Sequence, residues 1–178
     1  NQTFYTYAYD YNNDTWTTKT ALNTSGSARY LLKMAYDSES DRVIVNASTG
    51  NNLTFYTYAY DYNNDTWTTK TPINTSGNSR YILNSTYDSE SDRVIMIGSS
   101  GNSLTFYTYA YDYNNDTWST KTALNTSGSQ RYLLTTTYDS ESDRVVLFAS
   151  SGNNLTFYTH TYDYNNDSWA NKTALNTS

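Results

Sequence analysis

The stretch Thr3–Thr20, which reads TFYTYAYDYNNDTWTTKT, recurs along the chain and decides its fold. It returns as Thr54–Thr71 and Thr105–Thr122, and with a few changes as Thr156–Thr173. A linking stretch repeats with the same spacing, as Arg29–Val45, Arg80–Met96 and Arg131–Leu147. The chain is therefore one unit of about fifty residues used three and a half times, and such a long period is typical of repeat architectures.

Within the unit, residues 4–11 alternate between two kinds of side chain. Tyr5, Tyr7 and Tyr9 fall on one face of an extended chain, while the opposite face is mostly small. A helix would scatter these tyrosines around its surface. The sequence therefore predicts a strand with one bulky face.

The rest of the unit predicts three more strands joined by polar turns. Residues 12–14, Asn-Asn-Asp, tolerate a left-handed backbone, so they predict a hairpin turn before a return strand at 16–20. After a loop that contains serine and glycine, we expect strands at 30–36 and 42–45, separated by the acidic turn 37–41. The predicted fold class is all-β, with tandem four-stranded antiparallel blades of about 51 residues.

Three repeated motifs carry a family resemblance. An arginine opens one strand of each unit, at Arg29, Arg80 and Arg131. A Tyr-Asp pair closes that strand, at Tyr36-Asp37, Tyr87-Asp88 and Tyr138-Asp139. Another Tyr-Asp pair precedes each tryptophan, at Trp16, Trp67, Trp118 and Trp169. On these motifs the unit resembles a kelch-type β-propeller blade, which the galactose-oxidase-like propellers also use. The glycine pair of that family is replaced here, by Asn46-Ala47, Gly98-Ser99 and Ala149-Ser150.

The resemblance divides the chain into a half blade at 1–28 and three blades at 29–79, 80–130 and 131–178. Propellers close with about four to eight blades, so three and a half do not close a ring. We therefore expect a segment of a longer array, or an open array that associates head to tail with copies of itself.

Packing between blades is the expected role of the repeated aromatic and arginine side chains. They are Tyr5, Tyr7, Tyr9, Trp16, Trp67, Trp118, Trp169, Arg29, Arg80 and Arg131. The tyrosines of one blade would cover the threonine and alanine of the next, with their hydroxyls at polar edges or water. The alternative is that these faces are exposed and bind sugars or a surface.

N-linked glycosylation is the most informative local signal, because the chain contains fourteen Asn-x-Ser/Thr sequons. Four lie in the first hairpin turn, at Asn13, Asn64, Asn115 and Asn166. Four lie in the loop between blades, at Asn23, Asn74, Asn125 and Asn176. Three lie in another loop, at Asn1, Asn52 and Asn154, and the others are Asn46, Asn84 and Asn171. A chain rich in Asn, Ser and Thr makes sequons by accident, but their place in loops favours glycans on an extracellular or cell-surface protein.

Composition argues against several classes of partner. The net charge is −6 and no basic cluster is present, which argues against a nucleic-acid partner. No apolar run reaches the roughly 18 residues that a membrane span needs. There is no cysteine, so disulfides and thiolate metal sites are excluded. The chain lacks a signal peptide and does not begin with methionine, which we interpret as a mature or trimmed product.

Catalytic and metal signals are weak. His160, the single histidine, occupies a tyrosine position of the earlier units, so we interpret it as a substitution on the tyrosine face. Asp37, Glu39 and Asp41 alternate as carboxylates of the kind that bind Ca²⁺, but the glycine and distal glutamate of an EF-hand loop are missing. The copper site of galactose oxidase, with its histidines and Cys-linked tyrosine, cannot form here. We therefore predict no enzyme, no metal and no cofactor.

Two functions remain from the sequence. The first is an extracellular scaffold, in which a glycan-coated array forms a surface layer, stalk or fibre by self-association. The alternative is a closed propeller, encoded by a longer chain, whose loops bind a protein or carbohydrate ligand.

Overall fold

The computed structural model of the chain describes residues 2–24, 26, 29–48, 54–75, 81–99, 104–126, 131–151 and 156–177. Within this part of the chain, all regular secondary structure is β-strand. These residues include no helix that could cross a membrane.

The strands form four antiparallel sheets. The first sheet pairs β1 (Gln2–Asp10) with β2 (Thr15–Thr24). The second has the order β3 (Tyr30–Asp37), β4 (Arg42–Ser48), β5 (Thr54–Asp61) and β6 (Thr66–Asn74). The third has the order β7 (Tyr81–Asp88), β8 (Arg93–Ser99), β9 (Thr105–Asp112) and β10 (Thr117–Asn125). The fourth has the order β11 (Arg131–Asp139), β12 (Arg144–Ser151), β13 (Thr156–Asp163) and β14 (Ser168–Asn171), with the short β15 (Leu175–Asn176) also paired to β13.

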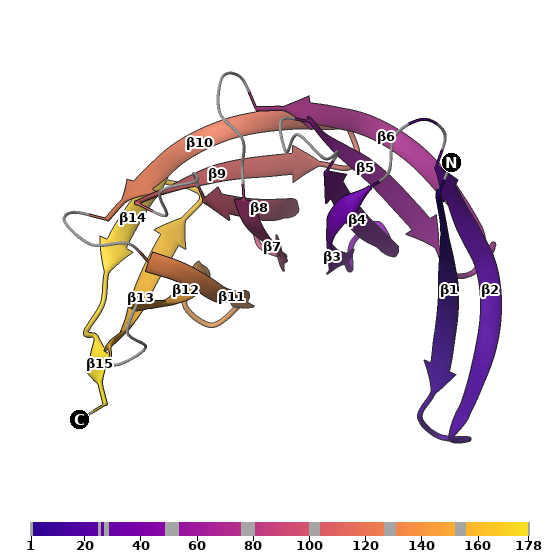
Figure 1. The fold of residues 1–178 in the computed structure, drawn as a ribbon, viewed down its shortest axis with the longest axis horizontal. Coiled ribbons are helices and arrows are strands. Elements are labelled where there is room, and N and C mark those ends of the chain that lie inside the picture. Colours follow the sequence, from indigo (N-terminus) through magenta and orange to yellow (C-terminus); the bar gives the residue numbers. More distant parts are fainter. Residues whose placement is uncertain are drawn as a thin grey trace.

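The four sheets follow one another around an open arc (Figure 1). Strands β3, β7 and β11 lie next to one another on its concave side. Strands β2, β6, β10 and β14 follow its convex side. The predicted fold class, tandem four-stranded antiparallel blades in an open array, is confirmed.

Every well-formed hairpin turn uses the same six-residue pattern, Tyr-Asp-x-x-x-Asp. The last aspartate has a positive φ of 47–54°, at Asp14, Asp41, Asp65, Asp92, Asp116, Asp143 and Asp167. Aspartate is one of the few residues that adopts this conformation at low cost. The tyrosine hydroxyl donates to that aspartate, as from Tyr60 to Asp65 at 2.6 Å. The first aspartate accepts a backbone N–H, as Asp61 does from Asn64 at 3.0 Å. Two carboxylates and one hydroxyl thus fix each turn.

Apolar side chains fill the space between successive sheets. The tyrosine face of each sheet packs on the opposite face of the sheet before it, as Tyr109 and Met96 do on Phe55 and Ile73. The same packing joins the third and fourth sheets, with Ile95, Ile97, Phe106, Val145, Leu147 and Tyr162. Each fully buried side chain of this size stabilises the fold by roughly 1.5–3 kcal/mol. No sheet therefore has a core of its own, and each depends on its neighbours.

Two details of the predicted packing were wrong. The tyrosine face covers the preceding sheet rather than the next one. Tyr5, Tyr7 and Tyr9 are 72%, 56% and 45% exposed, although their equivalents Tyr58 and Tyr60 are 3% and 5% exposed. The reason is position, because among the described residues no sheet lies in front of the first one.

The convex side holds a second contact between sheets, which we call the outer seam. The indole N–H of Trp118 donates to the carbonyl oxygen of Thr71 at 3.0 Å and to the hydroxyl of Thr57 at 3.1 Å. The carboxylate of Asp116 accepts the backbone N–H of Thr71 at 2.9 Å. The same indole contacts recur at the other two seams, through Trp67 and Trp169. The seam thus bonds backbone groups of one outer strand to the hairpin of the next sheet.

Trp118→Ala should lower the free energy of unfolding by about 3 kcal/mol, because it removes buried ring area and both seam bonds. Trp16, which is 69% exposed, provides the matched control. Trp16→Ala should cost less than about 1 kcal/mol. Urea unfolding at low protein concentration measures both values, and equal losses would show that the seam does not stabilise the arc.

Candidate functional site

A groove of about 490 Å³, which we call the axial groove, lies across β3, β7 and β11 where these strands enter their turns. Its aromatic lining repeats with the blades, as Tyr36, Tyr87 and Tyr138. Its hydroxyl lining comes from Ser38, Ser85, Thr86, Ser89, Thr137 and Ser140. Aromatic faces beside hydroxyl donors and acceptors suit a ligand that presents both C–H groups and hydroxyls.

The turns hold the three groove tyrosines in place. Each donates its hydroxyl to the aspartate that ends its turn, Tyr36 to Asp41 at 2.8 Å, Tyr87 to Asp92 at 2.9 Å and Tyr138 to Asp143 at 3.0 Å. Burial, followed by the hydrogen bond to Asp143, raises the pKa of Tyr138 to about 12. The hydroxyl therefore stays a neutral donor near neutral pH. Tyr36 is 54% exposed, so much of its ring remains open to the groove.

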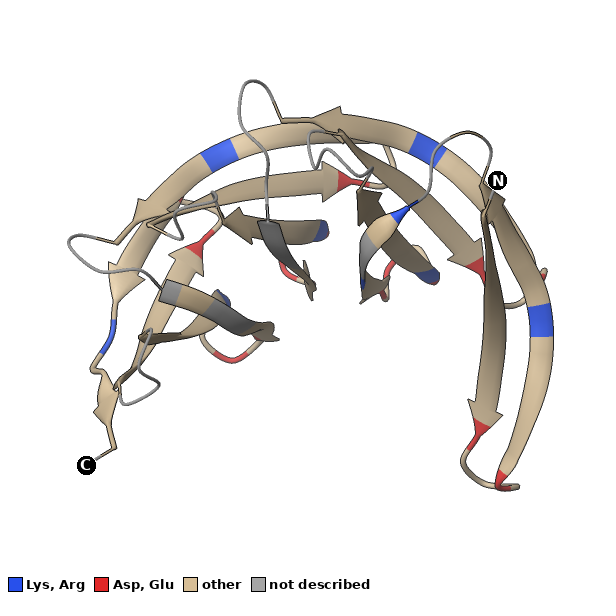
Figure 2. Cartoon of the chain, viewed as in Figure 1, with Lys and Arg blue, Asp and Glu red and all other residues tan. Residues whose placement is uncertain are grey.

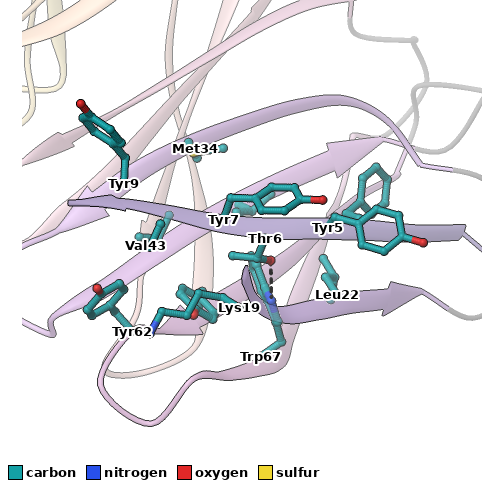
Figure 3. A pocket seen from close by; sticks show the side chains of 14 residues that line it. Tyr5, Thr6, Tyr7, Tyr9, Lys19, Leu22, Met34, Val43, Tyr62 and Trp67 are labelled. Atoms are coloured by element: carbon teal, nitrogen blue, oxygen red, sulfur yellow. Dashed lines mark hydrogen bonds between the residues drawn. The ribbon is translucent and has the colours of Figure 1, made fainter. Parts of the chain in front are cut away.

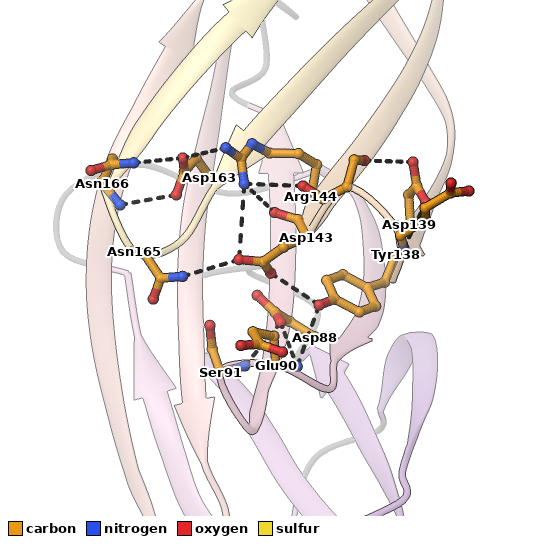
Figure 4. Close-up of polar contacts among 12 residues, drawn as sticks. Asp88, Glu90, Ser91, Tyr138, Asp139, Asp143, Arg144, Asp163, Asn165 and Asn166 are labelled. Atoms are coloured by element: carbon orange, nitrogen blue, oxygen red, sulfur yellow. Dashed lines mark hydrogen bonds and ion pairs between the residues drawn. The ribbon is translucent and has the colours of Figure 1, made fainter.

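An acidic cluster joins the third and fourth sheets beside the groove (Figure 4). The hydroxyl of Tyr138 accepts the backbone N–H of Glu90 at 3.3 Å. The buried carboxyl of Asp88 accepts the backbone N–H groups of Glu90 at 3.2 Å and Ser91 at 3.1 Å. Burial raises the pKa of Asp88, and the nearby charge of Asp143 raises it further. Asp88 is thus the carboxyl in this cluster whose charge the fold disfavours.

Ion pairs connect the two hairpin turns of each complete sheet. Arg144 pairs with Asp163 at 2.8 Å, and Asn165 donates to Asp143 at 3.0 Å (Figure 4). The hydrogen bonds from Asn166, and after them the charge of Arg144, hold the pKa of Asp163 below its usual range, although burial opposes them. The equivalent pairs are Arg42 with Asp61 at 2.8 Å and Arg93 with Asp112 at 2.7 Å. Figure 2 shows the acidic residues gathered at these turns, while Lys19, Lys70 and Lys121 lie on the outer strands β2, β6 and β10.

A second hollow, of about 560 Å³, lies along the free edge of β1 (Figure 3). Its walls include Leu22, Val45 and Met34, and Met34 is 62% exposed. At the next interface Ile44 covers Val94, because β3 and β4 fill the corresponding space. This edge hollow is mostly apolar and, although five tyrosines line it, it lacks the repeated serine and threonine hydroxyls of the axial groove. We therefore take the axial groove as the candidate site.

Most described sequon asparagines are accessible. The turn asparagines Asn13, Asn64, Asn115 and Asn166 are exposed, as are Asn23, Asn74, Asn125, Asn171 and Asn176. The amide nitrogen of each turn asparagine donates to the aspartate three residues earlier, at 2.7–2.8 Å. Asn84 is half-buried and Asn46 is buried. Asn1, Asn52 and Asn154 lie outside the described residues.

Arg29 is buried at the first interface. Its guanidinium group lies 3.7 Å from the ring centre of Tyr56, and its Nε donates to the hydroxyl of Tyr58 at 3.1 Å. Arg80 and the side chain of Arg131 lie outside what the structure describes.

His160 is buried at the position of Tyr58 and Tyr109. Its Nδ1 lies 2.8 Å from the side-chain oxygen of Asn171. Among the described residues, no group of three or more His, Asp or Glu side chains is arranged to hold a metal ion.

Two features of the site were not predicted from the sequence. One is the set of aspartates that link the sheets, Asp65, Asp116 and Asp167. The other is the grouping of Tyr36, Tyr87 and Tyr138 in one groove. The signal for the aspartates was present, because Tyr-Asp-x-x-x-Asp occurs at both turns of every unit. The grouping of the tyrosines depends on the curvature of the arc.

Comparison of the sequence with protein families gives no match, and no curated protein matches either. The structure, however, is similar to several solved structures. The fold is β-propeller-like. The SapL1 lectin, solved with alpha methyl fucoside, aligns with a TM-score of 0.60 at 11% identity, over 96% of this chain and 55% of the lectin. A protein from Lactobacillus plantarum gives a TM-score of 0.63 at 11% identity, over 98% of this chain and 50% of that one.

An exo-beta-1,3-galactanase from Phanerochaete chrysosporium, solved with beta-1,3-galactotriose, aligns with a TM-score of 0.58 at 11% identity, over 98% of this chain and 47% of the enzyme. The chain thus spans about half the length of these structures. Identities this low show the fold alone.

These comparisons refine and correct the expectations from sequence. The propeller-like blade is confirmed, whereas membership of the kelch family is not shown. The prediction that the chain is not an enzyme is corrected, because the same fold occurs in a galactanase and so does not exclude catalysis. The surface-layer scaffold finds no support among the similar structures, which agree better with the alternative, a ligand-binding propeller.

Asp88→Asn should raise the melting temperature at pH 7. A carboxyl with a raised folded-state pKa lowers stability above its unfolded-state value of about 3.9, and asparagine keeps the acceptor oxygen without the charge. Asp139, the equivalent residue of the next sheet, is the control, because hydrogen bonds from Ser142 lower its pKa. Asp139→Asn should lower the melting temperature at pH 7. Both differences should shrink at pH 3, and an Asp88→Asn loss at pH 7 would contradict this assignment.

Expression in a host that attaches N-glycans should modify Asn64 and Asn115 and leave Asn46 bare in the folded, secreted protein. The turn asparagines are exposed, whereas Asn46 is buried and lies within 3.5 Å of the Thr57 hydroxyl. Glycopeptide mass spectrometry measures the occupancy of each site. A glycan on Asn46 in folded protein would contradict the burial of that side chain.

Proposed function

We propose that this chain is a carbohydrate-binding module of propeller-like fold. The observation that carries the proposal is the axial groove, where three equivalent tyrosines and six hydroxyl side chains converge. Sugar rings present apolar C–H faces that stack on aromatic rings, and hydroxyls that exchange hydrogen bonds with serine and threonine. The similarity to a lectin solved with a fucoside and a galactanase solved with a galactotriose supports this class of ligand.

The repetition of the groove favours recognition of a short saccharide over a single sugar ring. Tyr36, Tyr87 and Tyr138 come from neighbouring strands of the same type, so similar contacts recur at blade spacing along the groove. A ligand that engages more than one of these contacts gains affinity from each.

Two finer assignments belong to the same proposal. We assign the blades to the kelch type on the Tyr-Asp and tryptophan motifs, which occur in every unit. We also place the protein outside the cell, because nine of the described sequon asparagines are exposed.

Titration calorimetry with methyl alpha-fucoside, galactose and beta-1,3-galactotriose, preceded by a glycan array, tests the binding. Tyr36→Ala should weaken binding of any saccharide that the array identifies by at least about tenfold, because truncating an aromatic anchor of a binding site typically costs about 2 kcal/mol or more. The exposed ring makes the substitution compatible with folding.

Tyr9→Ala is the matched control. Tyr9 is 45% exposed and donates to Asp14 at 2.5 Å, so it loses the same kind of turn bond as Tyr36 while lying outside the axial groove. Its affinity for the saccharide should not change. Equal losses in both variants, or no bound glycan on the array, would overturn the proposed function.

A further inference from the structure

The negative charge of this chain is confined to its hairpin turns. All 17 aspartates and glutamates belong to a Tyr-Asp-x-x-x-Asp turn (Figure 2). Each complete sheet has two such turns, which lie at the same end because its four strands form an antiparallel meander. We call the turns that border the axial groove the inner turns, at 37–41, 88–92 and 139–143, and the others the outer turns, at 61–65, 112–116 and 163–167.

The outer turns are matched by cations. Their first aspartates pair with an arginine of the same sheet, Asp61 with Arg42 at 2.8 Å, Asp112 with Arg93 at 2.7 Å and Asp163 with Arg144 at 2.8 Å. A lysine of the preceding sheet stacks on the tyrosine of each outer turn, with Lys19, Lys70 and Lys121 at 4.3, 4.2 and 4.1 Å from the ring centres of Tyr62, Tyr113 and Tyr164. Each outer turn thus has two cations beside its two carboxylates.

The inner turns carry more negative charge and fewer cations. Each contains three carboxylates, as Asp37, Glu39 and Asp41 do in the second sheet. The arginines contact these turns only at longer distances, 3.8 Å to Asp92 and 3.9 Å to Asp143, while their shorter bonds go to the outer turns.

The middle carboxylate of each inner turn is the available one. Glu39, Glu90 and Glu141 are exposed, and none of the ion pairs among the described residues uses them. They directly follow the serines that line the axial groove, Ser38, Ser89 and Ser140. The backbone N–H of Glu90 donates to the hydroxyl of the groove residue Tyr138 at 3.3 Å, so its turn is fixed against the groove (Figure 4).

The described lining of the groove includes no lysine or arginine to offset these carboxylates. Lys33 also lies on β3, but four residues before Asp37 and outside the lining. The groove therefore combines aromatic rings and hydroxyls with a rim of negative charge that recurs in each blade.

We propose that the axial groove binds saccharides that carry protonated amines, such as deacetylated amino sugars, and that Glu39, Glu90 and Glu141 determine this specificity. The inference rests on the proposed function and names the class of saccharide. An ammonium group donates three hydrogen bonds, and carboxylates are among its strongest acceptors. Tyrosine rings also attract cations. Saccharides with carboxylate groups would meet like charge at the rim and be rejected.

Titration calorimetry with a glucosamine trisaccharide and its N-acetylated form tests the inference, because acetylation removes the charge and leaves the rings and their hydroxyls. At about pH 6 the glutamates are ionised. The amine form should then bind at least about tenfold tighter, as expected for charge-assisted hydrogen bonds. Raising the salt from about 0.05 M to about 0.5 M should remove most of this difference, because the glutamates are exposed to solvent. A trisaccharide of uronic acids should not bind.

Glu90→Gln removes one rim charge and keeps the size of the side chain and the backbone N–H that Tyr138 accepts. It should weaken binding of the amine form by at least about fivefold and leave the N-acetylated form unchanged. Asp14→Asn is the matched control, because it changes the net charge equally at an exposed turn outside the groove. It should change neither affinity, and equal losses in both variants would show that the net charge of the chain attracts the amine, which would overturn the inference.

The outcomes separate this inference from the proposed function. If neutral saccharides bind and the amine form binds no tighter, the inference is wrong and the proposed function stands. If Tyr36→Ala leaves the affinity of the amine form unchanged, the amine binds outside the groove and the inference is also wrong. If no saccharide of any charge binds, both are wrong. Circular dichroism melts should show that Glu90→Gln keeps the fold, as expected for an exposed side chain.

Discussion

The array depends on one repeated contact, in which an aspartate carboxylate both shapes its own turn and binds the preceding sheet, at Asp65, Asp116 and Asp167. Asp116 ends its own hairpin at a φ of 52°, accepts the hydroxyl of Tyr111 at 2.6 Å, and accepts the backbone N–H of Thr71 from the preceding sheet at 2.9 Å. The bond that shapes the turn therefore also orients the oxygen that holds the neighbouring sheet. A change at this aspartate affects local and tertiary structure together.

This double use explains why the units are nearly identical. Each sheet must present the tyrosine face to the preceding sheet and the alanine and phenylalanine face to the following one, because no sheet buries its own core. Because every interface joins the same two faces, the same residues satisfy the packing at each interface. The surfaces at the two ends of the arc are consequently copies of buried surfaces, which accounts for their exposed Trp16 and Leu175.

The curvature of the arc creates the axial groove. Strands β3, β7 and β11 meet on the concave side, and their turns bring Tyr36, Tyr87 and Tyr138 into one lining. The acidic turns lie beside this lining, and the buried Asp88 carries a raised pKa. The same local turn pattern on the convex side contributes instead to the outer seams, through Asp65, Asp116 and Asp167. The same turn pattern thus lines the axial groove on the concave side of the arc and makes a packing contact on the convex side.

The sequence by itself determined the repeat, the four strands of each unit and the positions of the turns, because strand alternation and aspartate-rich turns are local properties. The sequence placed Tyr11 in a strand, whereas the structure places it in the turn. The reason is that the strand ends at Asp10, the first aspartate of the Tyr-Asp-x-x-x-Asp turn. Only the tertiary structure decided which sheet each tyrosine face covers, that Tyr5 and Tyr7 stay exposed, and that three distant tyrosines share a groove. Those features depend on the direction and curvature of blade stacking, which result from contacts between units and leave no trace within a single unit.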